Sequence, residues 1–373
     1  MNEKILKSLI YWSKGIKQPP DQVQIYPTNK CNLNCLFCCQ QLGEYNIHKD
    51  VTKKKWLEVA EELCTMGVKN ILISGGGEPL LSNATIEMME LFKKNNVIGR
   101  MIHNGTLWTD TLINRTISIG WDSLIFSIDG LEKTHDFLRG KKDSFSKIIE
   151  NIRRFNYIKL KLNKIKPIIE TTTVLTVYNY KEIPNFVMFA DSLDIKNITV
   201  EPVCVNNPSV EKMKLNKEQR TEFLEKILPK AEKIAKQRGI STNFHKLKEV
   251  KVIEKTGNLK DEILKGNKQI NQETFIKNLP ESLKRFINLP CYEPWLWPKI
   301  EANGEVWPCS TVPLKENIKE KSFREIWYGS EFAKFRDRIM NKDLPESCSN
   351  CVLTHLETNS KIRNPLLNLI QTK

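Results

Sequence analysis

The stretch Cys31-Asn-Leu-Asn-Cys35-Leu-Phe-Cys38 decides the fold of this chain, and it follows a short apolar segment at residues 23–26. Its three cysteines lie within eight residues, so three thiols share one loop. Iron–sulfur clusters are normally held by four cysteine thiolates. A loop that supplies only three leaves one iron without a protein ligand, and such an open position is where a substrate or cofactor binds.

A structural zinc site and a disulfide knot are the alternative interpretations of this loop. Zinc is usually bound by pairs of Cys-x-x-Cys or by cysteine with histidine, and no fourth ligand lies nearby in a suitable pattern. Disulfides suit small secreted domains, whereas this chain has 373 residues and no visible signal peptide. An iron–sulfur cluster is therefore the favoured interpretation.

The composition is that of a globular protein with two or three domains, because 40% of its 373 residues are hydrophobic. No run of about eighteen apolar residues occurs, so we expect neither a transmembrane helix nor a membrane partner. Residues 1–21 contain apolar positions interrupted by lysines, which predicts a short amphipathic helix and not a signal peptide. We therefore expect a cytoplasmic protein.

The cysteine content indicates bound metal, because ten cysteines in a reducing compartment bind metal more often than they form disulfides. The five histidines form no metal-binding pair at helical spacing, which argues against hydrolytic metal chemistry. The net charge of +14 would permit nucleic acid or an acidic peptide to bind. The lysines are spread along predicted helices without interleaved aromatic residues, so we interpret them as solvated helix faces and expect no nucleic acid partner.

Residues 22–205 alternate between strand and helix patterns, the signature of a parallel α/β fold. The predicted strands are residues 23–26, 70–74, 99–103, 123–128, 169–177 and 197–202. The predicted helices between them are residues 54–66, 85–95, 109–118, 144–157 and 181–192. Six strand–helix units are too few to close an eight-stranded barrel, and in such folds the chemistry lies at the carboxyl ends of the strands.

Polar and glycine-rich motifs follow three of these strands. Ser74-Gly-Gly-Gly-Glu78-Pro comes after the second, and its glycines let the backbone approach a ligand closely. His103-Asn-Gly-Thr106 follows the third, where we assign His103 no role beyond a polar strand end. The fourth strand is followed by Ser127-Ile-Asp-Gly130 and then by residues 134–140, in which an arginine paired with Asp136 in a loop is the alternative to a ligand contact.

The C-terminal part carries a second set of cysteines, Cys291-x12-Gly304-x4-Cys309 followed by Cys348-x-x-Cys351. Asn303-Gly304 is a strong hairpin signal between residues 298–302 and 305–308. Such a hairpin brings Cys309 toward the segment that follows Cys291, and a predicted helix at residues 323–340 leads to the last pair. Four thiols from three segments make a closed site, which suits either zinc or an iron–sulfur cluster.

These features resemble the radical S-adenosylmethionine (SAM) enzymes, whose hallmark is Cys-x3-Cys-x2-Cys with an aromatic residue, here Phe37, before the third cysteine. The resemblance implies an open, partial (β/α)6 TIM-like barrel in which Cys31, Cys35 and Cys38 hold a [4Fe–4S] cluster. It also implies that the amino and carboxylate groups of SAM chelate the fourth iron. One electron from the cluster then cleaves SAM to a 5′-deoxyadenosyl radical.

The same resemblance implies SAM contacts at matching positions of this chain. Gly76, Gly77 and Glu78 look like the family's Gly-Gly-Glu motif, which binds the SAM amino group. In the branch of the family that carries SPASM domains, the residue matching Ser127 contacts the ribose and the one matching Arg139 contacts the carboxylate. Together with Phe37, these residues form the expected cofactor-binding set.

The C-terminal cysteines resemble the SPASM/twitch extension of this family, which implies one auxiliary [4Fe–4S] cluster held by Cys291, Cys309, Cys348 and Cys351. Beside a radical SAM core we favour this cluster over zinc. The full SPASM pattern has two further cysteines, and none follows residue 351. The expected organisation is an amphipathic lead-in (1–21), a radical SAM core (22–205), a helical bridge (206–290) with one long helix at residues 216–239, a SPASM/twitch-like domain (291–355) and a tail (356–373).

The implied activity is that of an oxidoreductase or epimerase that abstracts hydrogen from a substrate carbon. We expect a peptide or protein substrate that is epimerised, crosslinked or oxidised. The alternatives are a dehydrogenase or epimerase of aminosugars or other small molecules, a tRNA-modifying enzyme, and a non-catalytic iron–sulfur or zinc scaffold. The expected partners are an electron donor such as flavodoxin or ferredoxin and, because only about twenty residues precede the first strand, a separate leader-peptide-binding protein.

Cys204 is a candidate catalytic residue because it follows the sixth strand and is needed by neither cluster. A thiol there could return a hydrogen atom to a substrate radical, which would give an epimer. The alternative is that Cys204 is a small buried hydrophobic residue, as free cysteines commonly are. Of the other cysteines, Cys39 lies beside the cluster loop and Cys64 falls within a predicted helix.

Overall fold

The computed structural model describes residues 3–38, 50–204, 208–253, 280–351, 359 and 361–366. Cys39, residues 254–279 of the predicted bridge and most of the predicted tail lie outside the described residues. The chain divides into two compact units, residues 1–24, 58–70 and 250–373 in the first and residues 25–57 and 71–249 in the second. The boundaries fall within β1 (Gln22–Ile25), α2 (Lys53–Met66), β2 (Asn70–Ile73) and α11 (Phe244–Ile253). None of the described helices is long and apolar enough to cross a membrane.

The second unit is built on a sheet whose strands stand in chain order from β1 to β7. After β1 and β2 come β3 (Ile98–His103), β4 (Ser123–Ser127), β5 (Ile168–Leu175), β6 (Asn197–Pro202) and β7 (Ser241–Thr242). Neighbours from β3 to β7 are parallel. The strand order has two ends, so the sheet is open, which confirms the expected partial barrel. The short β7 was not expected, because two residues are too few for a periodic signal.

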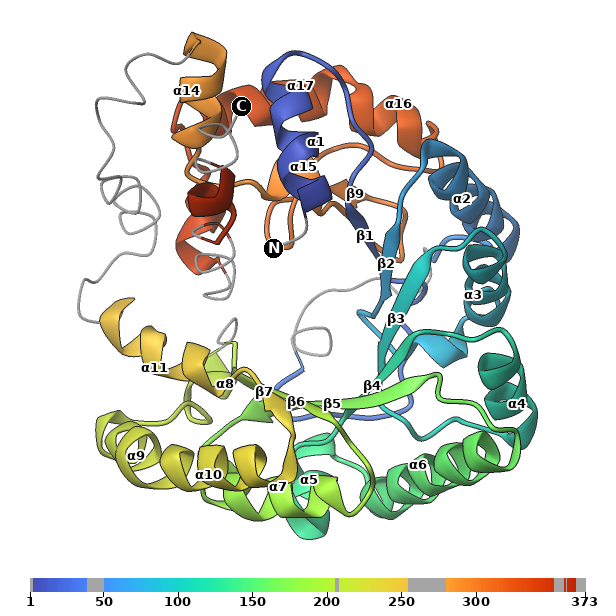
Figure 1. Ribbon diagram of the computed structural model, residues 1–373, viewed down its shortest axis with the longest axis vertical. Helices are drawn as coiled ribbons and strands as arrows, with labels where there is room; N and C mark the ends of the chain where they lie inside the picture. The colour runs from blue at the N-terminus through green and yellow to red at the C-terminus, as the bar shows by residue number, and fades with distance from the viewer. Residues whose placement is uncertain are drawn as a thin grey trace. The chain divides into compact units, whose positions relative to one another are not determined.

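The outer face of this sheet is covered by helices that follow the strands (Figure 1). They are α3 (Thr85–Lys94), α4 (Asp110–Ser118), α6 (Ser144–Lys161) and α7 (Ile183–Asp191). Each buries an apolar stripe, in which Phe92, Ile113, Phe155 and Phe186 are fully buried. Burying such a side chain stabilises the fold by roughly 1.5–3 kcal/mol. β4 is buried along its whole length, whereas the burial of β5 alternates along the strand.

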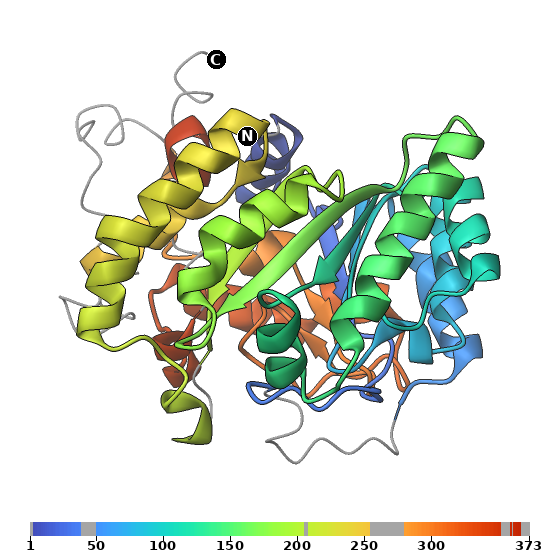
Figure 2. The same ribbon diagram turned by 90° about the horizontal axis from the view of Figure 1, so that it is seen from below.

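Residues 132–139 form the helix α5 (Glu132–Arg139), where the sequence predicted only a loop. The helix ends at Gly140, whose φ of 60° is left-handed and suits glycine at this position. Figure 2 shows α5 and the loop after β1 on the same side of the sheet. The short turns η2 (Pro79–Leu81) and η3 (Tyr180–Glu182) complete the connections of the barrel.

Part of the predicted helical bridge belongs to the second unit. It contains α8 (Pro208–Glu211), α9 (Lys217–Glu222), α10 (Leu228–Arg238) and residues 244–249 of α11. The expected single helix at residues 216–239 is interrupted by a π-helical segment, η4 (Phe223–Ile227). Asn216 caps its start in a capping box with Gln219, and Gly239 ends it with a φ of 65°.

The first unit combines the N-terminal helix with the C-terminal elements. These are α1 (Glu3–Ser13), α14 (Glu281–Ile287), α15 (Glu293–Leu296), the antiparallel β8 (Lys299–Ile300) and β9 (Val306–Trp307), α16 (Phe323–Tyr328), α17 (Ser330–Met340) and η6 (Glu346–Asn350). The predicted hairpin is present, with Gly304 at a φ of 91°. The helix predicted at residues 323–340 is divided at Gly329, because the extended conformation of Gly329 ends α16 and begins α17.

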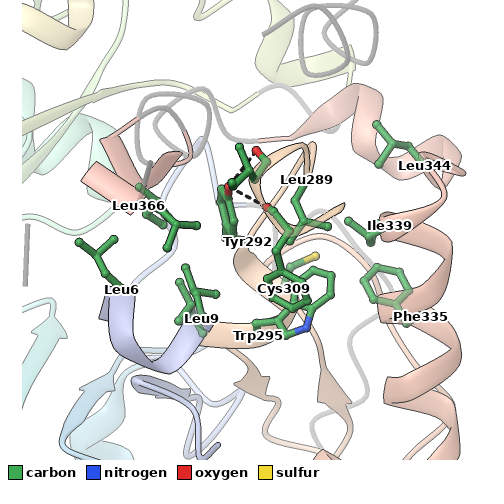
Figure 3. Close-up of a cluster of buried hydrophobic side chains, with 14 of the residues drawn as sticks. Leu6, Leu9, Leu289, Tyr292, Trp295, Cys309, Phe335, Ile339, Leu344 and Leu366 are labelled. Atoms are coloured by element: carbon green, nitrogen blue, oxygen red, sulfur yellow. Dashed lines mark hydrogen bonds between the residues drawn. The ribbon is translucent and has the colours of Figure 1, made fainter. Parts of the chain in front are cut away.

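The core of the first unit joins both ends of the chain (Figure 3). Leu6 and Leu9 of α1 are buried in one cluster with Trp295, Phe335 and Leu366. The apolar face of the predicted amphipathic helix is therefore packed inside this unit. The four C-terminal cysteines also belong to the cluster, Cys309 within it and the other three packed against it.

Candidate functional site

The cysteine loop of the second unit is held by the last turn of α5. The backbone N–H of Asn34 donates to the carbonyl of Arg139 (3.2 Å), and that of Leu36 donates to the carbonyl of Leu138 (2.9 Å). The final carbonyls of a helix have no partner inside the helix, so they are available for this contact. Gly140 lies so close to the loop that a Cβ atom there would overlap the carbonyl oxygen of Asn34.

Cys31, Cys35 and Cys38 are free thiols on this loop. Burial raises the pKa values of the Cys31 and Cys35 thiols above that of an ordinary cysteine. The positive charge of Arg139 lowers the pKa of Cys35 and so partly opposes this shift. Such thiols ionise readily only when a positive metal centre stabilises the thiolate. The donor set, three sulfur atoms on one loop, therefore fits an iron–sulfur cluster with one iron left open.

The glycine-rich loop after β2 lies directly against the segment that precedes Cys31. The backbone N–H of Gly77 donates to the Thr28 carbonyl (3.0 Å), and that of Glu78 donates to the Lys30 carbonyl (2.8 Å). A Cβ atom at Gly77 would overlap the Lys30 carbonyl oxygen. Glycine is required here for packing between two loops, a reason that the sequence alone could not separate from an approach to a ligand.

Glu78 is buried and holds two strand ends together. Its Oε2 accepts from the backbone N–H of Asn104 (2.7 Å), and its Oε1 accepts from that of Leu80 (3.3 Å). Burial raises the pKa of Glu78 to about 7, although these two hydrogen bonds oppose the shift. A carboxylate has about four lone-pair positions, so Glu78 retains acceptor capacity for a further donor.

Two asparagines join the cysteine loop to the loop after β3. The Asn104 amide donates to Asn32 Oδ1 (2.8 Å), and the Asn32 amide donates to Thr106 Oγ1 (2.8 Å). Sequence reasoning missed both roles, although Asn32 stands between the cysteines and Asn104 directly after a strand. His103 is buried and accepts from Trp108 Nε1 (3.4 Å). Burial lowers the pKa of His103 to about 3, so its side chain is a neutral packing element.

Arg139 connects a buried carboxylate to the cysteine loop. Its Nε lies 2.6 Å from Asp129 Oδ2, and Asp129 is fully buried. Its Nη1 lies 3.7 Å from Cys35 Sγ, and its guanidinium stands 5.5 Å from the centre of the Phe37 ring. The loop pairing with Asp136 was the wrong interpretation, because Asp136 instead accepts from the backbone of residues 143 and 145 and from Ser144.

The remaining predicted residues lie near the carboxyl ends of the strands. Ser127 is the last residue of β4 and is buried. Cys204 follows β6 by two residues and is exposed, so it is not the buried hydrophobic residue of the alternative interpretation. Its neighbour Val203 is buried in a small cluster with Leu138, against which Phe37 packs. The chain at Cys204 therefore runs beside the cysteine loop.

The four C-terminal cysteines of the first unit line a single cavity of about 30 Å³. Cys291, Cys309, Cys348 and Cys351 share it with Glu293, whose pKa burial raises to about 8. Burial also raises the pKa of the Cys291 and Cys309 thiols. Among the described residues, no group of three or more cysteine, histidine, aspartate or glutamate side chains is arranged to hold a single metal ion. A closed set of four sulfur donors around one cavity fits a four-cysteine cluster.

Comparison with known proteins places family matches on both sites. Residues 25–190 match the model of the radical SAM superfamily, and residues 291–352 match that of SPASM, an iron-sulfur cluster-binding domain. The first match contains the three-cysteine loop and the motifs after β2, β3 and β4. The second contains all four C-terminal cysteines. Between zinc and iron–sulfur at the C-terminal site, the domain match supports iron–sulfur.

Individual relatives differ in how much of the chain they cover. The sporulation killing factor maturation protein SkfB of Bacillus subtilis (strain 168) is 29% identical over 160 residues, 39% of this chain and 38% of that protein. The chain thus matches less than two thirds of the length of SkfB. The AdoMet-dependent heme synthase of Methanosarcina barkeri (strain Fusaro) is 25% identical over 87% of this chain and 86% of that protein. Streptococcus suis SuiB bound to precursor peptide SuiA shares the fold, with a TM-score of 0.60 at 17% identity over 90% of this chain and 71% of SuiB.

Proposed function

Because the chain carries a radical SAM domain and a SPASM iron–sulfur domain, and is therefore a radical SAM enzyme, we propose that it abstracts hydrogen from a carbon of a peptide or protein substrate. The observation that carries this proposal is the pairing of an open three-cysteine loop with a closed four-cysteine cavity in one chain. When bound, the cofactors supply a 5′-deoxyadenosyl radical. The similarity to a maturation protein supports the peptide as substrate class.

The residues around the cysteine loop have distinct roles in this proposal. Glu78 accepts the ammonium group of SAM while it keeps its two backbone hydrogen bonds. Arg139 receives the SAM carboxylate beside Cys35, and its pairing with Asp129 fixes the direction of the guanidinium. Gly76 and Gly77 contribute backbone groups, Ser127 contacts the ribose, and Phe37 forms an apolar wall.

The closed cavity and Cys204 support two different outcomes of catalysis. Four protein ligands leave the auxiliary site no open position, so it would accept an electron and give an oxidised or crosslinked product. Cys204 is exposed beside the loop and would instead return a hydrogen atom from its thiol to the substrate radical, which inverts the substrate centre. The thiyl radical left on Cys204 would be reduced to the thiol by one electron from the external donor and one proton from solvent. An electron donor such as flavodoxin or ferredoxin is the partner that this proposal requires.

A small molecule is the second candidate substrate class, because the heme synthase relative covers 87% of this chain. The decisive assay incubates the reduced, cluster-loaded enzyme and SAM with candidate precursor peptides in one arm and an iron porphyrin in the other. We expect a mass change in a peptide that depends on SAM and reductant. Turnover of the porphyrin with unchanged peptides would overturn the peptide proposal.

Glu78→Gln is expected to weaken SAM binding by roughly 1–3 kcal/mol, the scale of a hydrogen bond to a charged group. The amide also turns an N–H donor toward the backbone N–H of Asn104 or Leu80, so the melting temperature should fall as well. Calorimetric titration of SAM into the loaded protein measures the first effect. Glu87→Gln, at a half-buried residue paired with Lys53, is the control and should bind SAM normally. Unchanged affinity in Glu78→Gln would move the ammonium site elsewhere.

The affinity for SAM should also depend on pH through Glu78, whose pKa is raised by burial to about 7. Only the ionised carboxylate attracts an ammonium group, so affinity should rise as the pH increases through 7. The effect on the stability of the SAM-free protein has the opposite sign. The folded state favours the neutral carboxyl, so this contribution is present below the ordinary pKa and is lost as the pH rises toward 7. Glu78→Gln should remove both dependences, and a retained pH profile would assign it to another group.

Cys204→Ala tests the hydrogen-donor role in deuterated water with the true substrate. If Cys204 is the donor, the variant should still form 5′-deoxyadenosine but should lose the inverted product and its solvent deuterium. Mass spectrometry with chiral analysis of the product measures both. Cys64→Ala, at a cysteine of α2, is the control and should give the wild-type product. Full formation of product by Cys204→Ala would rule out the donor role and favour oxidation through the auxiliary site.

A further inference from the structure

The first unit contains a second pocket, of about 330 Å³, that shares no residue with the cysteine cavity. Helices α1, α14, α15, α16 and α17 contribute to its walls. Arg285 and Arg336 line it together with four aromatic side chains, Trp12, Phe286, Trp295 and Tyr328. The volume lies at the lower end of the range for pockets that enclose small ligands. Neither the three-cysteine loop nor the four-cysteine cavity uses this pocket.

Arg336 is a buried cation with incomplete pairing. Only 5% of its surface is exposed. Its Nε donates to the Pro294 carbonyl (2.9 Å) and its Nη1 to the Trp327 carbonyl (3.0 Å), while Nη2 is buried without a hydrogen-bond partner. Among the described residues no carboxylate forms an ion pair with it. Burial accordingly lowers the pKa of Arg336 to about 9.

A second unsatisfied donor lies beside it. The guanidinium of Arg336 stands 4.5 Å from the centre of the Trp12 ring, and Trp12 Nε1 is also buried without a hydrogen-bond partner. Leaving a buried donor unsatisfied costs about 1–3 kcal/mol, and more when the group is charged. Two such donors on neighbouring side chains of one pocket call for a ligand with acceptor atoms.

The other charges on the pocket wall favour an anion. Lys17 donates to the Tyr328 carbonyl (3.3 Å), and Arg285 donates to Asn341 Oδ1 (2.9 Å), so both cations are held in place by neutral acceptors. Asp337 is the single acid among the lining residues that the structure describes. Three cations against one acid leave the wall with a net positive charge, and its aromatic surface suits an apolar body.

We propose that this pocket binds a carboxylate carried on an aromatic or apolar body. The carboxylate oxygens would accept from Arg336 Nη2 and Trp12 Nε1 once these side chains turn toward the pocket, because both atoms are closed to solvent in this structure. The body would lie against Trp295 and Tyr328. The proposal stands on this unit alone and does not depend on the substrate of the radical site. The C-terminus of a peptide and a free aromatic acid share this chemistry.

Calorimetric titration of the cluster-loaded full chain tests the proposal with three probes: 4-phenylbutyrate, its uncharged amide, and N-acetyl-Leu-Phe with a free carboxylate. We expect saturable binding of one or both acids at millimolar concentration or below and none of the amide. Binding of the dipeptide alone identifies a peptide terminus as the source, whereas binding of both acids identifies the carboxylate class. Equal binding of acid and amide, or no binding of either acid, overturns the proposal.

Three variants place the binding in this pocket while the fold remains intact. Trp12→Phe keeps an aromatic ring but removes one donor, and should weaken acid binding about three- to tenfold, the value of one hydrogen bond. Ala333→Phe fills the pocket from an exposed position on its rim and should abolish binding. Arg285→Met should weaken binding, whereas Lys334→Met removes an equal charge outside the pocket and should not. Normal iron content and melting temperature show that each variant is folded, and wild-type affinity in both Trp12→Phe and Ala333→Phe would contradict the assignment.

Discussion

Replacing Cys31, Cys35 and Cys38 together with alanine is expected to abolish 5′-deoxyadenosine formation completely. The wild-type protein, reconstituted without oxygen, should contain about eight irons and eight sulfides, which corresponds to two [4Fe–4S] clusters. The triple variant should lose about half of each. All three sulfur atoms lie on the loop held by α5. Cys204 is the one other described cysteine of the second unit, and a single thiol cannot replace three. Iron and sulfide analysis with chromatography of the nucleoside measures the result.

The matched variant replaces Cys348 and Cys351, which line the separate cavity of the first unit. It should also lose about half of the iron. It should still cleave SAM to 5′-deoxyadenosine when the assay contains no substrate. Electron paramagnetic resonance of the reduced protein distinguishes the cluster that remains in each variant. Zinc without iron at the C-terminal site would contradict the auxiliary cluster, and continued SAM cleavage by the triple variant would contradict the assignment of the loop.

Gly140→Ala is expected to disable the SAM-binding site without changing any cysteine. Gly140 has a φ of 60°, which costs an alanine about 1–2 kcal/mol. An added Cβ would also overlap the carbonyl oxygen of Asn34 in the cysteine loop. Backbone cannot move as a flexible side chain can, so the loop must shift away from α5 and lose its two hydrogen bonds. We expect a total destabilisation of about 3 kcal/mol or more and loss of one cluster.

Gly239→Ala is the matched control for this variant. Gly239 ends α10 with a φ of 65°, and no atom lies within 4 Å of the Cβ position. It should therefore incur only the backbone strain of about 1–2 kcal/mol and keep a full iron content. Denaturant unfolding and iron analysis of both variants separate the cost of the positive φ angle, which both share, from the steric overlap with Asn34, which only Gly140→Ala has. Equal effects at the two glycines would show that the contact between α5 and the cysteine loop does not position the cluster.

The parts of the fold that follow a simple period were predictable. The six strands of the core fall within one or two residues of their predicted ranges, because alternating or continuous apolar runs bounded by polar motifs define them. α5 was missed because its polar residues 132–136 hide the period. β7 is too short to show any period. Gly329 divided the predicted helix at residues 323–340 through its extended backbone, which a helical apolar pattern does not reveal.

The candidate site was predictable in its residue types but not in its internal contacts. The spacing of Cys31, Cys35 and Cys38 is enough to place them on a common loop, and the polar motifs are recognisable because each follows a strand. Glu78 accepts from Asn104, and Arg139 pairs with Asp129 and not with Asp136. Both contacts depend on how far neighbouring strands extend relative to one another. Such distances arise from tertiary packing, and local sequence does not encode them. The burial of α1 with the C-terminal cysteines likewise joins segments that are far apart in sequence.

The central claim is that this chain uses its open three-cysteine site to cleave SAM reductively. The most direct measurement is the yield of 5′-deoxyadenosine from the reconstituted, dithionite-reduced protein with SAM, compared with the variant that lacks Cys31, Cys35 and Cys38. The account predicts formation of 5′-deoxyadenosine that requires SAM, reductant and the three cysteines. A wild-type protein with both clusters fully loaded that binds SAM but releases no 5′-deoxyadenosine would contradict it.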